Sequence, residues 1–462
     1  MSTIKNFLAL LAVYSLALSA SFSVCNASTI NVLSASFSHV SSAVSAANSG
    51  DTVVVPAGYA TWSSPLIITS GISLLGAGIG NTVITGDITD PYNGVISYKP
   101  DDAARGADNL FRVSGFTIDA DNKSNGIFVA NYSANPVTKV RIDHNRILNV
   151  GGTSAGRAIY IIGTVYGVAD NNTLEGFRHG MDSEGYNGGI PQWDNLTRAF
   201  GSANNFYFED NTLTRNDSGV FHAGGHGGRY VARYNDYINA GATNIFPVFD
   251  MHGNQPSSIC AMMVNEIYGN DVDLGTKGGR IIDQRGSMLM AFWNKVTWGS
   301  DGVYINIREE YLDSNYPSGN AYLMHVTNSY YWNIRANGTP LDSVVLSNNQ
   351  YEDAYDLAQN TDFWLHNTAY NGTTEIGIGC GSELPSNCTI GDGFWVTNQS
   401  CDSISDSNIG VNPTTPLSGT LYKCTAKNTW TSYYTPYTYP HPLRKEGTIS
   451  PPETPQNLKV VQ

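Results

Sequence analysis

Five short segments of the chain repeat one arrangement of ionisable side chains. Each has the order apolar, polar, variable, polar, and they read GMDSEG, VFHAGG, VFDMHG, IIDQRG and YINIRE. Alternate residues of a β-strand point to the same face, so the two polar positions of each segment would share a face. Stacking the segments aligns these positions in two columns: Asp182, His222, Asp250, Asp283 and Asn306, beside Glu184, Gly224, His252, Arg285 and Arg308.

These columns carry groups suited to acid–base chemistry. Adjacent strands lie about 4.8 Å apart, so the carboxylates of Asp250 and Asp283 would repel each other, and one would keep its proton to higher pH. An acid–base pair needs that difference in pKa. Arg285 and His252 beside them could neutralise a substrate carboxylate or accept a proton. Asp182 would lie two strands, about 10 Å, from Asp250, which is near the carboxylate separation of inverting glycosidases.

We therefore predict a functional site on this face. The alternative is a solvated face without a role, but such faces favour Lys, Glu, Thr and Ser over alternating Asp, His and Arg. The predicted catalytic residues are Asp250, Asp283, Arg285, His252 and Asp182.

Two insertions beside these segments carry aromatic rings, at residues 186–205 and 309–320. Aromatic rings on loops beside a rigid strip suit stacking on sugars, although they could also only hold the loops in place. The acids Asp182 and Glu184 could hold calcium through their oxygens, and no other cofactor is indicated. The predicted substrate-binding residues are Glu184, His222, Arg308, Asn306, Trp193, Tyr311 and Tyr316.

An asparagine repeat indicates how these segments are positioned. An apolar or β-branched run is followed by Asn, any residue and an apolar or aromatic residue, and such a unit is typical of a solenoid with loops on one side. Asn tolerates the left-handed backbone of a tight bend, and its side chain can bond its neighbours. We expect one Asn per coil, stacked inside a bend between two strands, at Asn145, Asn172, Asn211, Asn235, Asn270, Asn294, Asn328 and Asn349.

The N-terminal stretch fits the same architecture. Residues 36–48 have the helical spacing of Val40, Val44 and Ala47, and SGDTVVVPAG follows from Ser49. With the Asn repeat, this resembles the pectate-lyase-like superfamily, in which a short helix caps the open end and a GDTVxVPAG-like strand starts the first coil. The resemblance implies a right-handed, single-stranded parallel β-helix. That superfamily includes lyases, hydrolases, esterases, tailspikes and adhesins, so the fold alone selects no reaction.

The chain divides into four parts by these patterns. Residues 1–27 form a signal peptide and residues 28–350 the β-helix. Residues 351–440 are aromatic and Cys-bearing, and we expect a cap over the edge of the last coil. Residues 441–462 are Pro-rich and polar, as in a linker or tail.

The signal peptide has a positive Lys5, an apolar stretch over residues 7–18 and a cleavage position after Ala27. A lipoprotein anchor at Cys25 is the competing interpretation, but the residues before Cys25 fit that motif poorly. No later segment reaches 18 apolar residues, so no membrane span is expected. These features predict a secreted protein, extracellular or periplasmic.

Five cysteines remain after that cleavage. Four of them lie in the last quarter, where an exported chain could form two disulfides. Of the three pairings, proximity favours Cys380–Cys388 with Cys401–Cys424. Cys260 is expected to be a small buried hydrophobe, and zinc is disfavoured because no C-x2-C pair occurs.

Composition excludes some functions. The 462 residues include 39 acidic and 25 basic residues, which gives a net charge of −14. An acidic surface does not suit a nucleic-acid binder. The abundance of Gly and Tyr and the low charged fraction of 14% argue against a coiled coil.

We expect a secreted enzyme that cleaves a polysaccharide, and a lyase on a uronate-containing glycan is favoured because arginines stand beside the acids. In that hypothesis Arg285, Arg308 and His252 bind and neutralise the uronate carboxylate, and His252 or Arg285 removes the α-proton. Two alternatives remain. One is an inverting glycoside hydrolase that uses Asp250 and Asp283, or Asp182; the other is a non-catalytic glycan-binding or adhesive solenoid.

Overall fold

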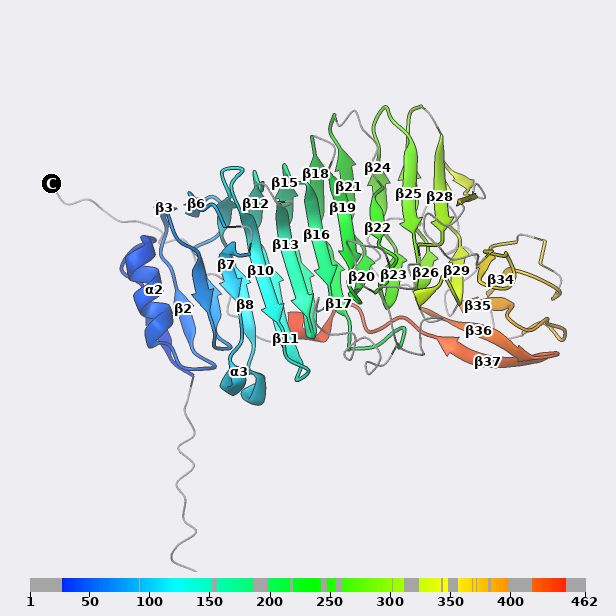
Figure 1. Ribbon diagram of the computed structural model, residues 1–462, viewed down its shortest axis with the longest axis horizontal. Helices are drawn as coiled ribbons and strands as arrows, with labels where there is room; N and C mark the ends of the chain where they lie inside the picture. The colour runs from blue at the N-terminus through cyan, green and yellow to red at the C-terminus, as the bar shows by residue number, and fades with distance from the viewer. Residues whose placement is uncertain are drawn as a thin grey trace, which may run out of the picture.

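The computed structural model describes residues 27–90, 92–151, 156–185, 198–216, 219–241, 247–254, 260–300, 302–310, 324–341, 344–347, 356–367, 369–370, 372–380, 384–397 and 418–445. Over most of this length the chain winds into a parallel β-helix, the expected fold class. Successive strands pass from one sheet to a second and then to a third, which we name sheets A, B and C (Figure 1).

Sheet A contains twelve parallel strands. They are β1 (Thr29–Asn31), β2 (Thr52–Val54), β5 (Ser73–Leu75), β8 (Phe111–Ser114), β11 (Val137–Asp143), β14 (Val165–Asp170), β17 (Phe206–Glu209), β20 (Arg229–Arg233), β23 (Val264–Tyr268), β26 (Met288–Phe292), β29 (Ser329–Trp332) and β33 (Phe363–Leu365).

Sheet B has eleven strands and ends in the antiparallel pair β30–β31. They are β3 (Gly58–Trp62), β6 (Thr82–Gly86), β9 (Thr117–Asp119), β12 (Arg146–Leu148), β15 (Thr173–Glu175), β18 (Thr212–Arg215), β21 (Asp236–Asn239), β24 (Asp271–Asp273), β27 (Lys295–Thr297), β30 (Arg335–Ala336) and β31 (Thr339–Pro340).

Sheet C has ten parallel strands and carries the segments singled out for their chemistry. They are β4 (Leu66–Ile68), β7 (Gly94–Tyr98), β10 (Asn125–Asn131), β13 (Arg157–Gly163), β16 (His179–Glu184), β19 (Val220–Gly225), β22 (Phe249–Met251), β25 (Gly279–Gln284), β28 (Val303–Arg308) and β32 (Val344–Ser347).

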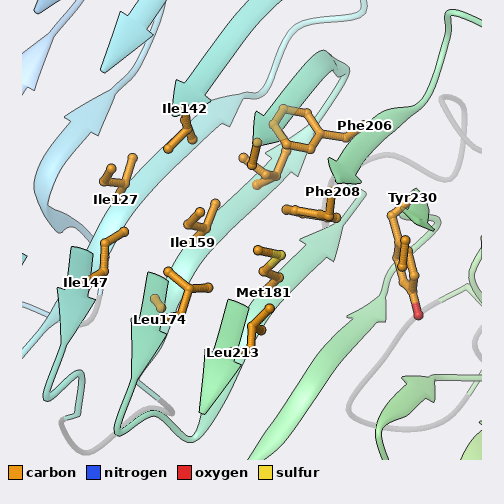
Figure 2. Close-up of a cluster of buried hydrophobic side chains, with 14 of the residues drawn as sticks. Ile127, Ile142, Ile147, Ile159, Leu174, Met181, Phe206, Phe208, Leu213 and Tyr230 are labelled. Carbon is orange, nitrogen blue, oxygen red and sulfur yellow. The ribbon is translucent and has the colours of Figure 1, made fainter. Parts of the chain in front are cut away.

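The interior of the coils is filled with apolar side chains from all three sheets (Figure 2). On sheet C, Ile127, Ile159 and Met181 occupy one column, and each is fully buried. Ile147 and Leu174 do the same on sheet B. Each coil therefore covers the apolar surface of the next, as a solenoid requires.

Asparagines stack at the bend between sheets A and B, as predicted. The Nδ2 of Asn172 donates to the Oδ1 of Asn211 at 2.9 Å, and that of Asn211 donates to Asn235 at 3.0 Å. The same Oδ1 atoms accept the backbone N–H of the preceding Asn. The stack continues in both directions, so its members are Asn145, Asn172, Asn211, Asn235, Asn270 and Asn294, each at most 2% exposed.

Two details of the predicted stack are wrong. The left-handed backbone lies one residue before each Asn, as at Asn171 (φ 54°) and Tyr234 (φ 58°). Asn328 is outside the stack, because strand pairing places Ile334 one coil after Asn294. Asn328 instead precedes β29 and accepts a hydrogen bond from Lys423. Asn349 lies outside the described residues.

The N-terminal end is closed by helix α2 (Phe37–Ala46), within the stretch predicted to be helical. Val40 is fully buried against the first coils, and the Phe37 ring meets the edge of Trp62, with centroids 5.7 Å apart. The indole of Trp62 donates to the carbonyl of Ala35 at 3.0 Å. Farther along, helix α3 (Asp102–Ala107) joins β7 to β8.

The last quarter of the chain forms a separate four-stranded sheet: β34 (Ile376–Cys380), β35 (Gly393–Thr397), β36 (Gly419–Ala426) and β37 (Thr429–Tyr434). A disulfide joins Cys388 to Cys424, so the predicted pairs Cys380–Cys388 and Cys401–Cys424 are wrong. Cys401 lies outside the described residues, and Cys260 is buried as expected. Pairing the cysteines by proximity in sequence fails here, because β36 pairs antiparallel with β35 and brings residues together that are distant in sequence.

After β37 the chain runs back along sheet A toward the middle of the solenoid (Figure 1). We call residues 435–445 the C-terminal strap; it ends in the 3-10 turn η5 (Pro442–Arg444). Its backbone carbonyls at Tyr437 and Thr438 accept from Arg233 at 2.8 and 2.9 Å. The strap thus extends five residues, 441–445, into the stretch expected to be a tail.

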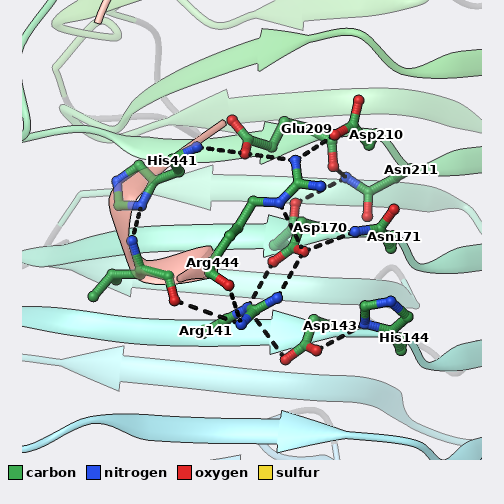
Figure 3. A network of polar contacts seen from close by, with 12 residues as sticks. Arg141, Asp143, His144, Asp170, Asn171, Glu209, Asp210, Asn211, His441 and Arg444 are labelled. Carbon is green, nitrogen blue, oxygen red and sulfur yellow. Dashed lines mark hydrogen bonds and ion pairs between the residues drawn. The ribbon is translucent and has the colours of Figure 1, made fainter. Parts of the chain in front are cut away.

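Ion pairs hold the strap against sheet A (Figure 3). Arg444 contacts Glu209 at 2.9 Å and Asp170 at 3.3 Å, and its carbonyl accepts from Arg141 at 3.2 Å. The carboxylates of Asp170 and Glu209 are fully buried. Burial of paired charges of this kind fixes one arrangement, because loss of either partner leaves an uncompensated charge.

No helix in the described part of the chain is long and apolar enough to cross a membrane.

The asparagine stack should be a main source of stability. Asn235→Leu removes the acceptor of Asn211 and the Nδ2 donor to the carbonyl of Phe208. We expect the free energy of unfolding to fall by roughly 3 kcal/mol, because buried backbone and amide groups lose their partners. Urea denaturation measures this, with the exposed Asn204→Leu as control. Equal midpoints for the two variants would contradict the role of the stack.

Buried Glu266 should make stability depend on pH. Its carboxylate accepts from Tyr434 Oη and from the Gly201 N–H, both at 2.7 Å. Burial raises the pKa of Glu266 to about 7, although these hydrogen bonds and the charge of Arg233 act to lower it. Its stabilising contribution is therefore complete below about pH 4.5 and is lost as pH rises to about 7, a change of roughly 3 kcal/mol.

Glu266→Gln should remove this part of the pH dependence. Unfolding measured at pH 5 and pH 8 should differ less in the variant than in the wild type. The control is Glu175→Gln, whose carboxylate is partly exposed and paired with Arg146. An unchanged pH profile in Glu266→Gln would mean that Glu266 is ionised throughout.

Candidate functional site

The outward face of sheet C carries the predicted strip of ionisable residues. Strand pairing aligns Asp250 with Asp283 and Asp283 with Asn306, as the sequence pattern predicted. On the preceding coils the outward column is Tyr160, Asp182 and Ala223. Thus four of the five predicted segments follow the frame, and the one on β19 does not.

His222 is the misplaced residue, because β19 is shifted by one position. It pairs with Met181 and Phe249 in the inward column and is fully buried. Its Nε2 lies 2.7 Å from Tyr237 Oη, and burial lowers its pKa to about 3. The predicted substrate contact by His222 is therefore wrong. Gly224 also faces inward, since a Cβ there would lie 2.6 Å from the sulfur of Met262.

Four predicted residues come together at the C-terminal part of the strip. Arg285 Nη2 lies 2.5 Å from Asp250 Oδ1, and its Nε lies 4.0 Å from Asp283 Oδ2. His252 Nε2 lies 3.4 Å from Asp250 Oδ2. We call Asp250, His252, Asp283 and Arg285, together with the side chains bound to them, the sheet C cluster.

Arg308 and Asn306 also belong to this cluster, as predicted from their positions beside Asp283 and Arg285 in the two columns. Arg308 Nη2 lies 3.3 Å from Asp283 Oδ2, and Asn306 donates to Asp283 Oδ1 at 2.7 Å. Two members were missed by the sequence reasoning. Arg280 lies 2.6 Å from Asp283, and buried Glu310 lies 3.2 Å from Arg285 and 3.1 Å from Arg308.

The expected repulsion between Asp250 and Asp283 is offset by guanidinium groups. Arg285 contacts both carboxylates, and Arg280 and Arg308 contact Asp283. Burial acts to raise the pKa of Asp250, but Arg285 and His252 outweigh it and hold that pKa below the ordinary range. Asp250 is therefore ionised at neutral pH and is not the carboxyl that keeps its proton.

A second group lies farther toward the N-terminus, on β13 and β16. Arg157 contacts both Asp182 and, at 3.1 Å, Glu184. His179 Nδ1 lies 3.0 Å from Asp182, and Tyr160 donates to Glu184 at 2.6 Å. Burial acts to raise the pKa of Asp182, but Arg157 and His179 lower it overall.

These contacts bear on the calcium hypothesis. The guanidinium of Arg157 already bridges Asp182 and Glu184, so the described residues offer calcium no open pair of carboxylates there. No group of three or more His, Cys, Asp or Glu within the described ranges is placed to hold a metal ion.

Three basic residues that the sequence reasoning missed share a pattern that is visible in the sequence. A basic residue stands three positions before the outward residue on three coils: Arg157 before Tyr160, His179 before Asp182, and Arg280 before Asp283. In the structure each of these side chains contacts the outward residue that follows it. Trp193, Tyr311 and Tyr316, predicted to bind substrate, lie outside the described residues.

Comparisons with known proteins add no assignment. No family model matches the chain, and no curated protein matches it. Among solved structures, ORF18 of Geobacillus virus E2 is similar with a TM-score of 0.32 and 14% sequence identity, over 86% of this chain and 72% of that chain. A similarity of that strength supports no argument about function.

The sheet C cluster should also contribute to stability, because several of its side chains are buried. The side chain of Arg285 is 8% exposed and that of Glu310 is fully buried. Arg285→Ala leaves Glu310 with less positive charge beside it, so the free energy of unfolding should fall by roughly 3 kcal/mol.

Arg308→Ala is the matched control, because Arg308 contacts the same Glu310 but is 21% exposed. Arg308→Ala should lower the free energy of unfolding by less than Arg285→Ala does, since water can solvate the acidic groups that remain at the more exposed position. Urea denaturation of both variants measures the difference. If Arg285→Ala unfolds at the wild-type midpoint, the cluster has no structural role.

Proposed function

We propose that the chain is a secreted polysaccharide lyase acting on a uronate-containing glycan at the outward face of sheet C. Enzymes of this kind occur in the pectate-lyase-like superfamily that the sequence resembles. The observation that carries the proposal is the imidazole of His252 beside Asp250, whose carboxylate also binds Arg285, in a cluster that includes Arg308. The leader pattern of residues 1–27 and the Cys388–Cys424 disulfide support secretion.

The cluster has the groups that β-elimination requires. A cation near the uronate carboxylate stabilises the negative charge that develops when the adjacent C5 proton is removed. Arg280 and Arg308 suit this role, because their side chains are 29% and 21% exposed while their acidic partners are buried. Arg285 is better suited to positioning, since it is enclosed between Asp250 and Glu310.

His252 is the best-placed base, because its side chain is 29% exposed and Asp250 can stabilise its protonated form. In the proposed step His252 takes the C5 proton, and the electron pair forms the C4–C5 double bond. The C4–O bond then breaks, and the departing oxygen takes a proton from water to become the hydroxyl of the new chain end, while protonated His252 returns its proton to solvent. The products are an unsaturated uronate and a shortened glycan.

An inverting hydrolase fits the same residues less well. It needs one carboxyl that keeps its proton at the working pH. Asp182 and Asp250, whose spacing suggested that mechanism, both have pKa values lowered by arginine neighbours. A non-catalytic binder would not need an imidazole beside a mostly buried carboxylate.

Incubation with a panel of glycans tests the proposal, with and without calcium or EDTA. Ultraviolet absorbance detects unsaturated uronates, and a reducing-end assay runs in parallel. We expect unsaturated product from a uronate-containing glycan. Reducing ends without unsaturation would indicate the hydrolase, and the absence of both would indicate a binder.

His252→Ala should lower kcat by roughly 100-fold or more, because the base is lost. His39→Ala is the control; His39 is exposed on helix α2, which closes the N-terminal end of the solenoid, several coils from His252. If both variants retain wild-type kcat, the base lies elsewhere.

A further inference from the structure

A cavity lies where the last coil of the solenoid meets the C-terminal sheet. Among the described residues sheet C ends at β32 and sheet B at β31, whereas sheet A continues through β33, beside which β34 begins the C-terminal sheet (Figure 1). The cavity beside this overhang has a volume of about 460 Å³, within the range of small-molecule sites. None of its lining residues belongs to the sheet C cluster.

One wall of the cavity is apolar. It includes Tyr331 of β29 and Leu365 of β33, which are neighbours in the strand pairing, and Leu341, which follows β31. Tyr331 is buried, whereas Leu365 and Leu341 are partly exposed. Such a wall can pack against the C–H groups of a ligand ring.

Polar side chains complete the lining: Asn333, Gln359, His366, Asn367 and Glu375. Asn333 Oδ1 accepts from the Nε of Arg335 at 3.3 Å, and Asn367 Oδ1 accepts from the Ala369 N–H at 2.8 Å. Within the described residues neither amide uses its Nδ2 as a donor. The cavity therefore has two amide donors to offer a ligand.

Glu375 supplies a fixed acceptor. Its Oε1 accepts from the Nε2 of Gln359 at 2.9 Å, and no donor among the described residues binds the other oxygen. Its backbone has φ 84°, a left-handed conformation that is uncommon for Glu. The N–H of Gly393 holds this conformation by donating to the Glu375 carbonyl at 3.0 Å. A residue held in such a conformation at the rim of a cavity is consistent with a ligand-binding role.

The charge of the lining selects the class of ligand. Burial and the charge of Arg335 lower the pKa of His366 to about 4, so its neutral ring has one donor and one acceptor, and Glu375 is the one charged residue of the lining. A ligand carboxylate would be repelled by Glu375. A ligand ammonium only donates, so it would leave the Asn333 and Asn367 donors unpaired. A hydroxyl both donates and accepts, and therefore matches the carboxylate and the amides together.

We propose that this cavity binds a neutral, hydroxyl-bearing sugar residue through the carboxylate of Glu375 and the amides of Asn333 and Asn367. It is a non-catalytic glycan site at the C-terminal end of the solenoid, separate from the strip on sheet C. The inference does not rest on the lyase proposal, because binding here uses no group of the sheet C cluster.

Titration of the full chain with the methyl glycosides of glucose, galactose and mannose tests the inference, with saturation-transfer NMR to detect binding and calorimetry to give Kd. We expect at least one of the three to bind. The amino sugar and the uronate that correspond to it should bind about tenfold more weakly, because each leaves polar groups of the cavity unpaired. No binding of the three neutral glycosides, or tighter binding of a charged counterpart, would overturn the inference.

Two variants place the sugar in the cavity. Glu375→Gln keeps the shape and removes the charge, so Kd should rise by about tenfold, and its control is Asp356→Asn, an exposed acid that does not line the cavity. Leu341→Trp fills the cavity without removing a polar group and should also raise Kd by about tenfold or more. Its control is Val345→Trp, which adds the same ring at a position on β32 that is 43% exposed. Circular dichroism checks that each variant is folded. Wild-type Kd in both Glu375→Gln and Leu341→Trp would overturn the inference.

His252→Ala separates this site from the strip on sheet C. His252 does not line the cavity, so the variant should bind the neutral glycoside with the wild-type Kd. Loss of binding in His252→Ala, together with wild-type binding in Glu375→Gln, would place the sugar at the sheet C cluster. That result would overturn the inference and leave the lyase proposal standing.

Discussion

Every functional alignment on this solenoid depends on the hydrogen bonds that join each Asn of the stack to the next. Each amide is fixed to the coil before it and the coil after it, so neighbouring coils cannot slide along each other. A shift of one residue would turn the whole outward column of sheet C into the core. The stack therefore sets where Asp250, Asp283 and Asn306 meet, although it lies at the opposite bend from sheet C.

The fold and most of the stack could be predicted because they repeat. A repeated unit is a pattern that local physics imposes on every coil, and its period is readable in the sequence. The register of a single strand is not protected in this way. For β19 the sequence VFHAGG allows either Ala223 or His222 outward, and only the partners decide: Tyr237 binds the imidazole of His222 from within the core. The Cys388–Cys424 pair and the C-terminal strap were missed for the same reason, since both depend on contacts between distant segments.

Charged residues make up only 14% of this protein. Among the described residues, buried ion pairs occur on the outward faces of sheets A and C. On sheet A the acids Asp170 and Glu209 are closed off by the strap and by Arg141, Arg233 and Arg444. On sheet C the same residue types are arranged differently. Arg280 and Arg308 keep 29% and 21% of their side chains exposed, and Asp182 retains an oxygen without a donor.

The two networks differ in how fully their buried groups are satisfied. A network that only stabilises the fold should satisfy its groups, because each unsatisfied buried charge costs free energy without return. The sheet A network meets that expectation, with Arg233 wholly buried and bonded to Glu209 and to two strap carbonyls. The strip on sheet C does not, because Asp182 Oδ1 is buried without a donor while Arg280 and Arg308 stay partly exposed.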